Sequence, residues 1–183
     1  GLRHLECYQG KMDVWCLFVD VGINFLKKNA ILSFIATNNW VTNAGAEKVR
    51  NKIIKETKLV SMIDFQDYMI FESASIQTMI FLLEKCKAPE KYTSQIYKAE
   101  SSFTRDDIDK IQSTAAIDSK VFKTFTVEIT RGDSINQPLL FNSDDKALIL
   151  DLIEKGGELR LAEKEIAQGI VPNPDRVNSR NIK

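Results

Sequence analysis

Polar and aromatic side chains follow a short apolar stretch near the start of the chain. The segment ILSFIATNNWV, residues 31–41, runs from six residues of buried-strand character directly into Thr37, Asn38, Asn39 and Trp40. In open α/β sheets, ligands bind at the edge where the parallel strands end. Amide groups that donate and accept hydrogen bonds, next to an indole ring, are suited to hold a flat heterocycle there. Asn and Thr are also favoured at helix caps, so the spacing by itself favours a cap, with the indole covering the sheet end.

A second aromatic group lies in DFQDYMIFESAS, residues 64–75, which links two predicted strands. This loop is expected at the same sheet edge, where it would bring Tyr68 and Phe71 close to Asn38 and Asn39. Aromatic residues in loops more often pack over a sheet end than bind ligands. Two aromatic rings and two amides at one edge nevertheless predict a place for a flat, ring-shaped ligand.

Several kinds of chemistry lack the residues that they need. His4 is the single histidine, and Cys7, Cys16 and Cys86 show no C-x-x-C spacing, which excludes a Cys/His zinc site and a Ser-His-Asp or Cys-His constellation. The D/E-x-K triplet of metal-dependent nucleases occurs no more often than chance gives in a chain with 25 acidic residues. No G-x-G-x-x-G or P-loop is present to cradle a nucleotide phosphate. No metal site is expected.

The bulk composition is that of an ordinary soluble protein, with 44% hydrophobic and 27% charged residues among 183. That length fits one domain, or one domain and part of a second, with a packed core. The 25 basic residues equal the 25 acidic ones, which argues mildly against a dedicated nucleic-acid binder but permits a local basic face. No apolar run reaches the roughly 18 residues of a membrane span, and scattered cysteines favour a reducing compartment. We therefore expect a cytoplasmic protein with no membrane partner.

Hydrophobic periodicity divides the first half of the chain into helices and strands. A helix is predicted over 13–28, with Asp13 as its N-cap. Its core-facing stripe is predicted to consist of Val14, Phe18, Val21 and Phe25. The segment 31–36 is predicted as a strand, 44–56 as a helix, and 58–65 and 75–83 as strands. Because parallel neighbours need a crossover and no helix separates the last two strands, 75–83 is predicted to run antiparallel.

The second half of the chain has a different texture. A turn and a polar edge strand are predicted within 87–100. Thr104 and Asp107 resemble a capping box for a short helix. The segment 120–129 alternates as a strand does, and a further helix is predicted over 143–153.

Lys48, Lys52 and Lys55 share the outer face of the helix predicted over 44–56. Their i, i+4 and i+7 spacing would let them contact DNA phosphates, because such contacts cluster at basic faces. A lysine stripe on a helix is more often simply solvated, so phosphate contact is the weaker interpretation.

Residues 10–85 resemble the gamma-class adenine-N6 DNA methyltransferases of restriction–modification systems, and among these the type IIG enzymes, which fuse endonuclease and methyltransferase. Residues 10–15 match the family pattern G-K-x-[DN]-x-[YW], and residues 26–40 match a turn and strand that end in N-x-W. A weaker likeness, over 165–178, is to the segment that opens the target recognition domain. The family's F-x-G-x-G and Asn-Pro-Pro-Tyr motifs are absent, so we expect a fragment from the middle of a larger protein, inactive by itself.

The resemblance implies an S-adenosyl-L-methionine-dependent parent enzyme of the prokaryotic cytoplasm that methylates double-stranded DNA after flipping the target adenine. It implies that Phe71 stacks on the flipped base and that Asp13 and Trp15 line a pocket for base or cofactor. The rim of that pocket is expected to comprise Asn38, Asn39, Trp40 and Tyr68.

The expected fold is α/β: the C-terminal half of a Rossmann-like methyltransferase sheet, with two parallel strands, an inserted antiparallel strand and flanking helices, followed by a smaller α+β segment. Residues 1–86 would belong to the catalytic domain, 87–164 to a connecting segment, and 165–183 to the start of a recognition domain. A bare edge on strand 31–36 invites pairing, which predicts a dimer or another covering element. Two other classes stay open: a non-catalytic α/β interaction module, and a Rossmann-like methyltransferase that acts on RNA or protein.

Overall fold

The computed structural model describes residues 4–10, 12–71, 73–87, 89–114 and 117–131. All of them lie in the first of the two units into which the chain divides, residues 1–146 and 147–183. Within the described residues, no helix combines the length and apolarity that crossing a membrane requires. The elements in chain order are α1 (Trp15–Phe25), β1 (Ile31–Thr37), α2 (Glu47–Glu56), β2 (Lys58–Asp64), β3 (Thr78–Glu84), β4 (Lys91–Ala99), α3 (Arg105–Thr114) and β5 (Phe122–Thr130).

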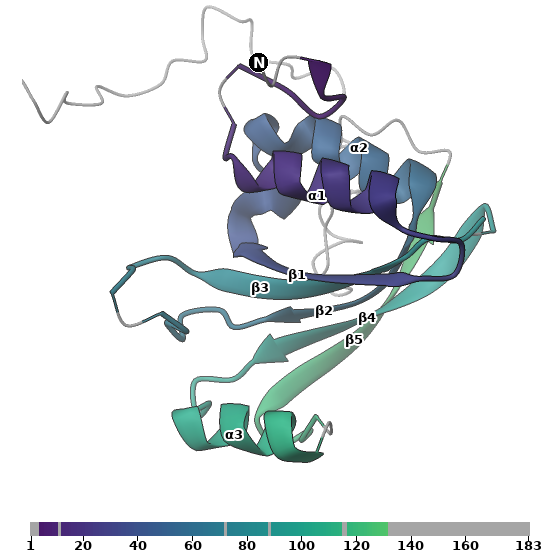
Figure 1. Ribbon diagram of the computed structural model, residues 1–183. Coiled ribbons are helices and arrows are strands. Elements are labelled where there is room, and N and C mark those ends of the chain that lie inside the picture. The colour runs from purple at the N-terminus through teal and green to yellow at the C-terminus, as the bar shows by residue number, and fades with distance from the viewer. Residues whose placement is uncertain (1–3, 11, 72, 88, 115–116, 132–183) are drawn as a thin grey trace, which may run out of the picture. The chain divides into compact units, whose positions relative to one another are not determined.

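The strands form one five-stranded sheet in the order β1-β3-β2-β4-β5 (Figure 1). β3 runs antiparallel to both of its neighbours, with Phe34 opposite Phe81 on one side and Met62 opposite Phe81 on the other. β3 is therefore inserted between β1 and β2, as the missing helix between β2 and β3 predicts. The predicted α/β fold, with an antiparallel strand inserted into a methyltransferase-like sheet, is confirmed.

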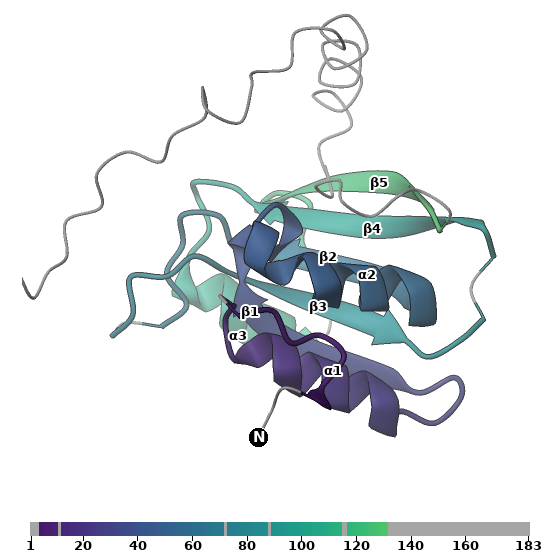
Figure 2. The ribbon, with the colours of Figure 1, turned by 90° about the horizontal axis from the view of Figure 1, so that it is seen from above.

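Helices cover the two faces of the sheet unequally. α1 and α2 lie side by side over one face, and α3 lies on the opposite side, near the ends of β4 and β5 (Figures 1 and 2). The core beneath α1 and α2 is built from fully buried side chains, among them Val19, Ile23, Trp40, Ile53, Leu59, Met62, Phe81, Leu83 and Ile96. A second, smaller cluster beneath α3 is centred on Phe65, Phe103 and Phe122.

The predicted core-facing stripe of α1 is wrong. Val14, Phe18 and Phe25 are 62%, 65% and 83% exposed, whereas the helix buries Cys16, Val19, Asp20 and Ile23. Both faces of α1 are rich in apolar residues, so periodicity by itself cannot tell which of them faces the sheet. The predicted N-cap is wrong as well, because Val14 occupies the cap position and no side chain there accepts a hydrogen bond.

The second half of the described chain extends the same sheet. β4, expected as an edge strand, is internal: it pairs in parallel with β2 and antiparallel with β5. The capping box at the start of α3 is confirmed, since Asp107 Oδ2 accepts hydrogen bonds from the backbone N–H (3.0 Å) and hydroxyl (2.8 Å) of Thr104. The predicted helix over 143–153 and the stretch 165–183 lie outside the described residues, and the proposed domain boundaries stay predictions.

The three cysteines are free thiols in very different surroundings. Cys7 and Cys16 are each 1% exposed, and burial, with further contributions from nearby carboxylates, raises the pKa of each thiol to about 12. Cys86 is half-buried, just beyond β3. We expect one thiol per chain to react rapidly with a chromogenic disulfide reagent near pH 8, and the other two only after denaturation.

Replacing Cys86 with Ser provides the control for that titration, because it should abolish the rapid phase and leave the slow one. Two or three rapidly reacting thiols in the native protein would contradict the packing of α1 and of the segment before it.

Candidate functional site

A hydrogen-bonded polar group joins the ends of three strands. Asn38, directly after β1, donates from Nδ2 to Asp64 Oδ1 at the end of β2 (3.3 Å) and to Gln77 Oε1 just before β3 (3.4 Å). Asp64, which is 8% exposed, also accepts from the backbone and side-chain nitrogens of Gln66, at 3.0 and 2.5 Å. Asn38 therefore lies at the polar sheet edge, as predicted. Its partners Asp64 and Gln77, and Gln66 bonded to Asp64, were missed, although all three lie at or within two residues of a predicted strand end.

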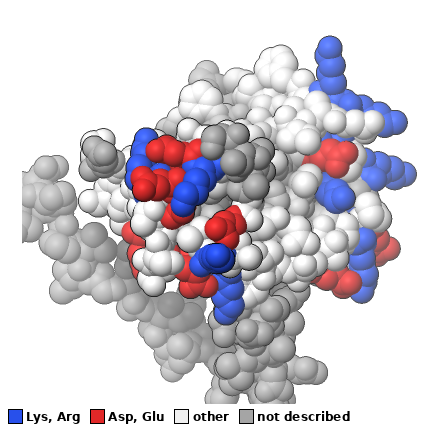
Figure 3. Space-filling view, turned by 90° about the horizontal axis from the view of Figure 1, so that it is seen from below, with Lys and Arg blue, Asp and Glu red and all other residues white. Residues whose placement is uncertain are grey.

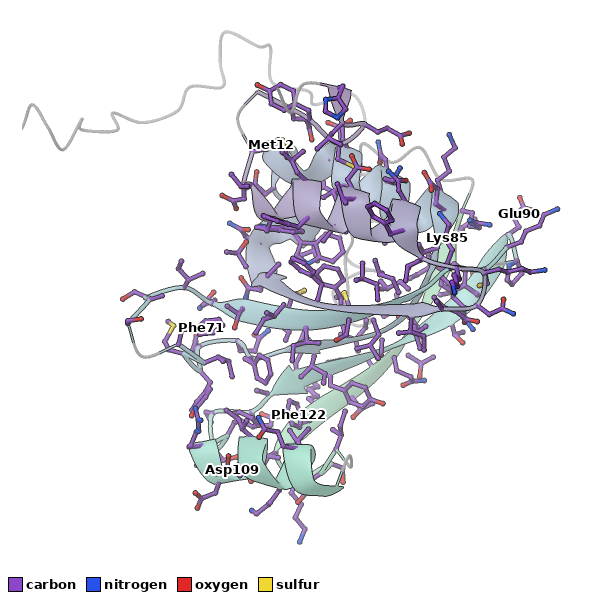
Figure 4. The ribbon with its side chains drawn as sticks, viewed as in Figure 1. Met12, Phe71, Lys85, Glu90, Asp109 and Phe122 are labelled. Atoms are coloured by element: carbon purple, nitrogen blue, oxygen red, sulfur yellow. The ribbon has the colours of Figure 1, made fainter. Side chains whose placement is uncertain are left out.

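The loop from Phe65 to Gln77 is held at its base by this polar group. Gln66 adopts a positive φ of 51°, which turns the chain away from β2, and Gln77 Nε2 donates to Asp67 Oδ1 at 2.6 Å across the loop. Phe71, 46% exposed, lies in the loop that projects beyond the sheet (Figure 4). The loop thus presents an exposed aromatic ring from a base that is fixed by hydrogen bonds.

A cavity of about 290 Å³ lies between the start of α1 and the turns that follow β1. Asp13, Trp15, Asn39 and Trp40 all border it, so four of the predicted pocket residues do come together. The Nε1 of Trp15 is buried and has no hydrogen-bond partner among the described residues. The cavity is bordered by polar side chains, those of Asp13, Asn39 and Asn43.

The side chain of Trp40 belongs to the core. The 3₁₀ turn over Asn38–Val41 directs its indole beneath the sheet, where it is fully buried, 5.0 Å from the Phe81 ring, with Nε1 3.0 Å from Met79 Sδ. Arg50 Nη1 donates to the Trp40 carbonyl at 2.6 Å and fixes the turn from the outside. Trp40 therefore borders the cavity while its side chain belongs to the core, and its place at a ligand-binding rim stays a prediction.

Tyr68 lies apart from that cavity. Its ring packs edge-on against Phe103, with centroids 5.0 Å apart, in the cluster beneath α3. The cavity that Asp13 and Trp15 border adjoins α1 on the other face of the sheet. The aromatic loop and the cavity are thus two neighbouring features of the sheet end, and the residues predicted for one pocket are divided between them.

The three lysines of α2 differ in their surroundings. Lys48 and Lys55 are exposed, and Lys48 Nζ donates to the Tyr8 carbonyl at 2.8 Å. Lys52 was expected on the outer face, which is wrong: it is 4% exposed, and its ammonium lies 2.5, 3.3 and 2.9 Å from carboxylates of Glu6, Asp20 and Glu56. Lys52 therefore joins α1, α2 and the preceding segment, and it has no open side for a phosphate.

The ion network around Lys52 shifts the pKa of two of its members, Lys52 and Glu56. Burial alone would lower the pKa of Lys52, but hydrogen bonds to its three carboxylate partners raise it above the usual lysine value. Burial would raise the pKa of Glu56, yet hydrogen bonds from Lys85 and Lys52 lower it. The cluster is a folded-state ion network, and among the described residues no group of three His, Cys, Asp or Glu side chains is arranged to hold a metal.

Comparisons with known proteins place this geometry in a family context. The family model described as Eco57I restriction-modification methylase matches residues 3–71. The type IIG restriction endonuclease BpuSI shares the fold at a TM-score of 0.50 and 13% identity, over 82% of this chain and 18% of BpuSI. The type I modification protein M.EcoKI gives a TM-score of 0.46 and 10% identity, over 83% of this chain and 45% of that one.

A putative class I S-adenosylmethionine-dependent methyltransferase from Listeria monocytogenes gives a TM-score of 0.46 and 19% identity, over 61% of this chain and 35% of that one. BpuSI has the highest TM-score of these three structures, and the chain spans about a fifth of its length. The resemblance to restriction–modification methyltransferases is confirmed, and residues 3–71 carry the sequence pattern of the Eco57I restriction-modification methylase family.

Proposed function

We propose that this chain is part of a site-specific DNA methyltransferase of a restriction–modification system, which transfers a methyl group from S-adenosyl-L-methionine to the N6 amino group of adenine. The observation that supports it most is the family match over residues 3–71, which ends at Phe71 and includes the polar sheet edge at Asn38 and Asp64. Without F-x-G-x-G and Asn-Pro-Pro-Tyr motifs, the chain would support methyl transfer only as part of the longer enzyme. Its cellular place would be the prokaryotic cytoplasm.

The role proposed for Phe71 follows from the geometry of duplex DNA. The amino group of a paired adenine is out of reach of an active site, so the base must leave the helix and be held by stacking and edge contacts. Phe71 offers an exposed ring for such stacking, and Asp64 and Asn38 fix the loop that carries it. A ring on a hydrogen-bonded loop loses less conformational freedom on binding than a ring on an unrestrained one.

The cavity at Asp13 and Trp15 is the proposed place of the cofactor or the base in this part of the enzyme. Its lining offers a carboxylate and the amides of Asn39 and Asn43. Such donors and acceptors fit the polar edge of an adenine ring, which both ligands contain. The methyl donor supplies the transferable methyl group, and the protein residues bind and orient.

Replacing Phe71 with Ala in the full-length enzyme should reduce binding of the extruded base, because stacking on an aromatic ring contributes about 1–3 kcal/mol per base. We expect a roughly tenfold to hundredfold loss in the fluorescence-monitored affinity for duplex DNA with 2-aminopurine at the target position. Phe71→Trp should retain most of that affinity. Transfer of radiolabelled methyl groups to DNA should fall with the same ranking.

Met69 provides the matched control, since it is 41% exposed in the same loop and offers no ring. Met69→Ala should leave both readouts within twofold of the wild type. Equal losses for the two variants would show that the loop acts only through its general shape, and the stacking role would be refuted.

A non-catalytic interaction module is the second candidate, and the apolar surface of α1 favours it. Val14, Phe18 and Phe25 of α1 are exposed. Ile31 and Ile35 of β1 are exposed as well, and the outer edge of β1 has no partner strand among the described residues. An unpaired strand edge and an exposed apolar patch of this kind usually mark a surface that another part of the protein or a partner buries. In the methyltransferase proposal the cover is another part of the same domain, whereas the interaction module would use a second copy or a different protein.

A further inference from the structure

A basic cavity lies at the end of the sheet opposite the candidate site. It has a volume of about 500 Å³, and five of its lining residues are cationic: Lys28, Lys55, Lys85, Lys87 and Arg131. Glu56 is the acidic residue in its lining. Figure 4 shows Lys85 and Phe71 at opposite ends of the sheet. The cationic residues come from four separate parts of the chain, so folding, and not a local charge run, assembles them.

The cations continue as a row across the whole end of the sheet. Lys28 precedes β1, Lys85 follows β3, Lys58 begins β2, Lys91 begins β4, and Arg131 follows β5. Every strand therefore contributes a basic residue at this end, in the spatial order β1-β3-β2-β4-β5. Four strand spacings of about 4.8 Å give the row a length of about 19 Å. Figure 3 shows Lys and Arg side chains along the corresponding rim.

Internal charge pairing accounts for only part of the positive charge of this row, to which Lys55 and Lys87 of the cavity are counted from here on. Lys85 pairs with Glu56 at 2.8 Å, and Lys91 with Glu128 at 3.5 Å. Lys28, Lys55 and Lys87 are exposed, and none of them has a carboxylate partner within 4.0 Å in the described part of the chain, where the ion pairs lie elsewhere.

Helix ends explain some of these cations but not the row. Arg131 Nε donates to the Ile54 carbonyl at 3.0 Å, and its guanidinium also contacts the Lys55 carbonyl, so it caps the C-terminus of α2. Lys55 lies in the last turn of α2, Lys58 follows that helix by two residues, and Lys28 follows α1 by three. Lys85, Lys87 and Lys91 belong to strands and strand connections away from the helix ends in the sequence.

We propose that this basic row binds the phosphodiester backbone of duplex DNA without reading its sequence. A row of about 19 Å is longer than a single phosphate or nucleotide needs, whereas duplex DNA presents one charge per about 1.7 Å of its axis. The choice of DNA as the polyanion rests on the proposed function. Seven-residue strands separate the row from the aromatic loop by about 23 Å, so the row is a second DNA contact, independent of the flipped base.

The test measures binding of the chain to a fluorescein-labelled 30-base-pair duplex of arbitrary sequence by fluorescence anisotropy, between about 50 and 200 mM KCl. Three phosphate contacts, from the lysines without a carboxylate partner (Lys28, Lys55 and Lys87), predict a slope of about −2.7 for the logarithm of the association constant against that of the salt concentration. The triple variant Lys28→Glu, Lys55→Glu, Lys87→Glu should bind at least tenfold more weakly at the lower salt concentration. Its slope should be shallower by about 2.7, the equivalent of three contacts.

A matched triple variant separates location from net charge. Arg105→Glu, Lys120→Glu and Lys123→Glu change the charge by the same amount on exposed residues of α3 and the start of β5, away from the row. This variant should bind DNA within threefold of the wild type. Equal weakening by both triple variants would overturn the proposal, because the effect would then come from net charge.

Competition separates a polymer site from a small-anion site. At constant ionic strength, 5 mM inorganic phosphate should leave DNA binding unchanged, and displacement of the duplex by phosphate would overturn the proposal. Met69→Ala, at an exposed position in the loop at the other end of the sheet, should not alter this binding. The row and the methyltransferase proposal can therefore fail separately, since the first is read from salt-dependent anisotropy and the second from base stacking and methyl transfer.

Discussion

Replacing Lys52 with Met should lower the free energy of unfolding by about 3–5 kcal/mol, the typical cost of removing one partner from a buried ion pair. Lys52 is the cation shared by Glu6, Asp20 and Glu56, and Asp20 is fully buried. Methionine keeps much of the apolar stem but removes the charge. Among the described residues, the Asp20 carboxylate then retains hydrogen bonds from the Cys7 backbone and the Asn24 amide but no cationic partner.

Urea unfolding followed by circular dichroism measures this loss. Lys55→Met, three residues further along α2 at an exposed position, is the matched control and should change the free energy of unfolding by less than about 0.5 kcal/mol. Adding Asp20→Asn to Lys52→Met should recover part of the loss, because the uncompensated charge is then gone. An equal effect of the two lysine substitutions would mean that the ion network does not exist as described.

The same network gives the stability a defined pH dependence. Because the pKa of Glu56 is lowered in the folded state, its contribution is present above the unfolded-state value of about 4.3 and is lost as the pH falls through the folded-state value. Lys52→Met removes one of the two hydrogen bonds that lower this pKa. The variant should therefore lose less further stability than the wild type between pH 5 and pH 3.

Trp40→Ala should destabilise the fold by about 3–5 kcal/mol, as deletion of a large aromatic side chain from a core does. The indole is fully buried and packs against Phe81 and, at 6.4 Å between centroids, against Trp15. Its removal would open a hollow under the sheet end and leave the turn over Asn38–Val41 without its anchor. The urea midpoint measures the effect, and Trp40→Phe should recover much of it.

Phe71→Ala is the natural contrast to Trp40→Ala. Phe71 is 46% exposed, so its removal should change the free energy of unfolding by less than about 0.5 kcal/mol while it reduces base stacking. A large stability loss for Phe71→Ala, or a small one for Trp40→Ala, would contradict the assignment of one ring to function and the other to the core.

Local patterns predicted the elements well where one signal dominates. The strand over 31–36, the helix over 44–56 and the antiparallel strand over 75–83 depend on short-range periodicity and on the lack of a crossover helix, and the structure has each of them. The capping box at Thr104 and Asp107 needs only residues three apart. Such features are determined by neighbours in the chain.

The predictions were wrong where contacts between residues far apart in the sequence determine which side chains are buried. α1 offers two apolar faces, and only its contact with the sheet and α2 selects the one that carries Val19 and Ile23. Lys52 was expected in solvent, but its partners Glu6 and Asp20 lie 46 and 32 positions away, which no local pattern reveals. The burial of Trp40 also depends on distant residues, because its indole packs against Met79 and Phe81, about 40 residues further on.

The outer edge of β1 has no partner strand among the described residues, and this has a consequence for chain topology. A crossover between parallel strands is right-handed in nearly all proteins, and α1 and α2 cover the same face of the sheet. α2 connects β1 to β2 on the side of β3. By the same handedness, a parallel strand that enters β1 through α1 can lie only on the opposite side, at the open edge. The handedness of the crossovers therefore fixes the edge of the sheet, that of β1, at which such a strand would pair.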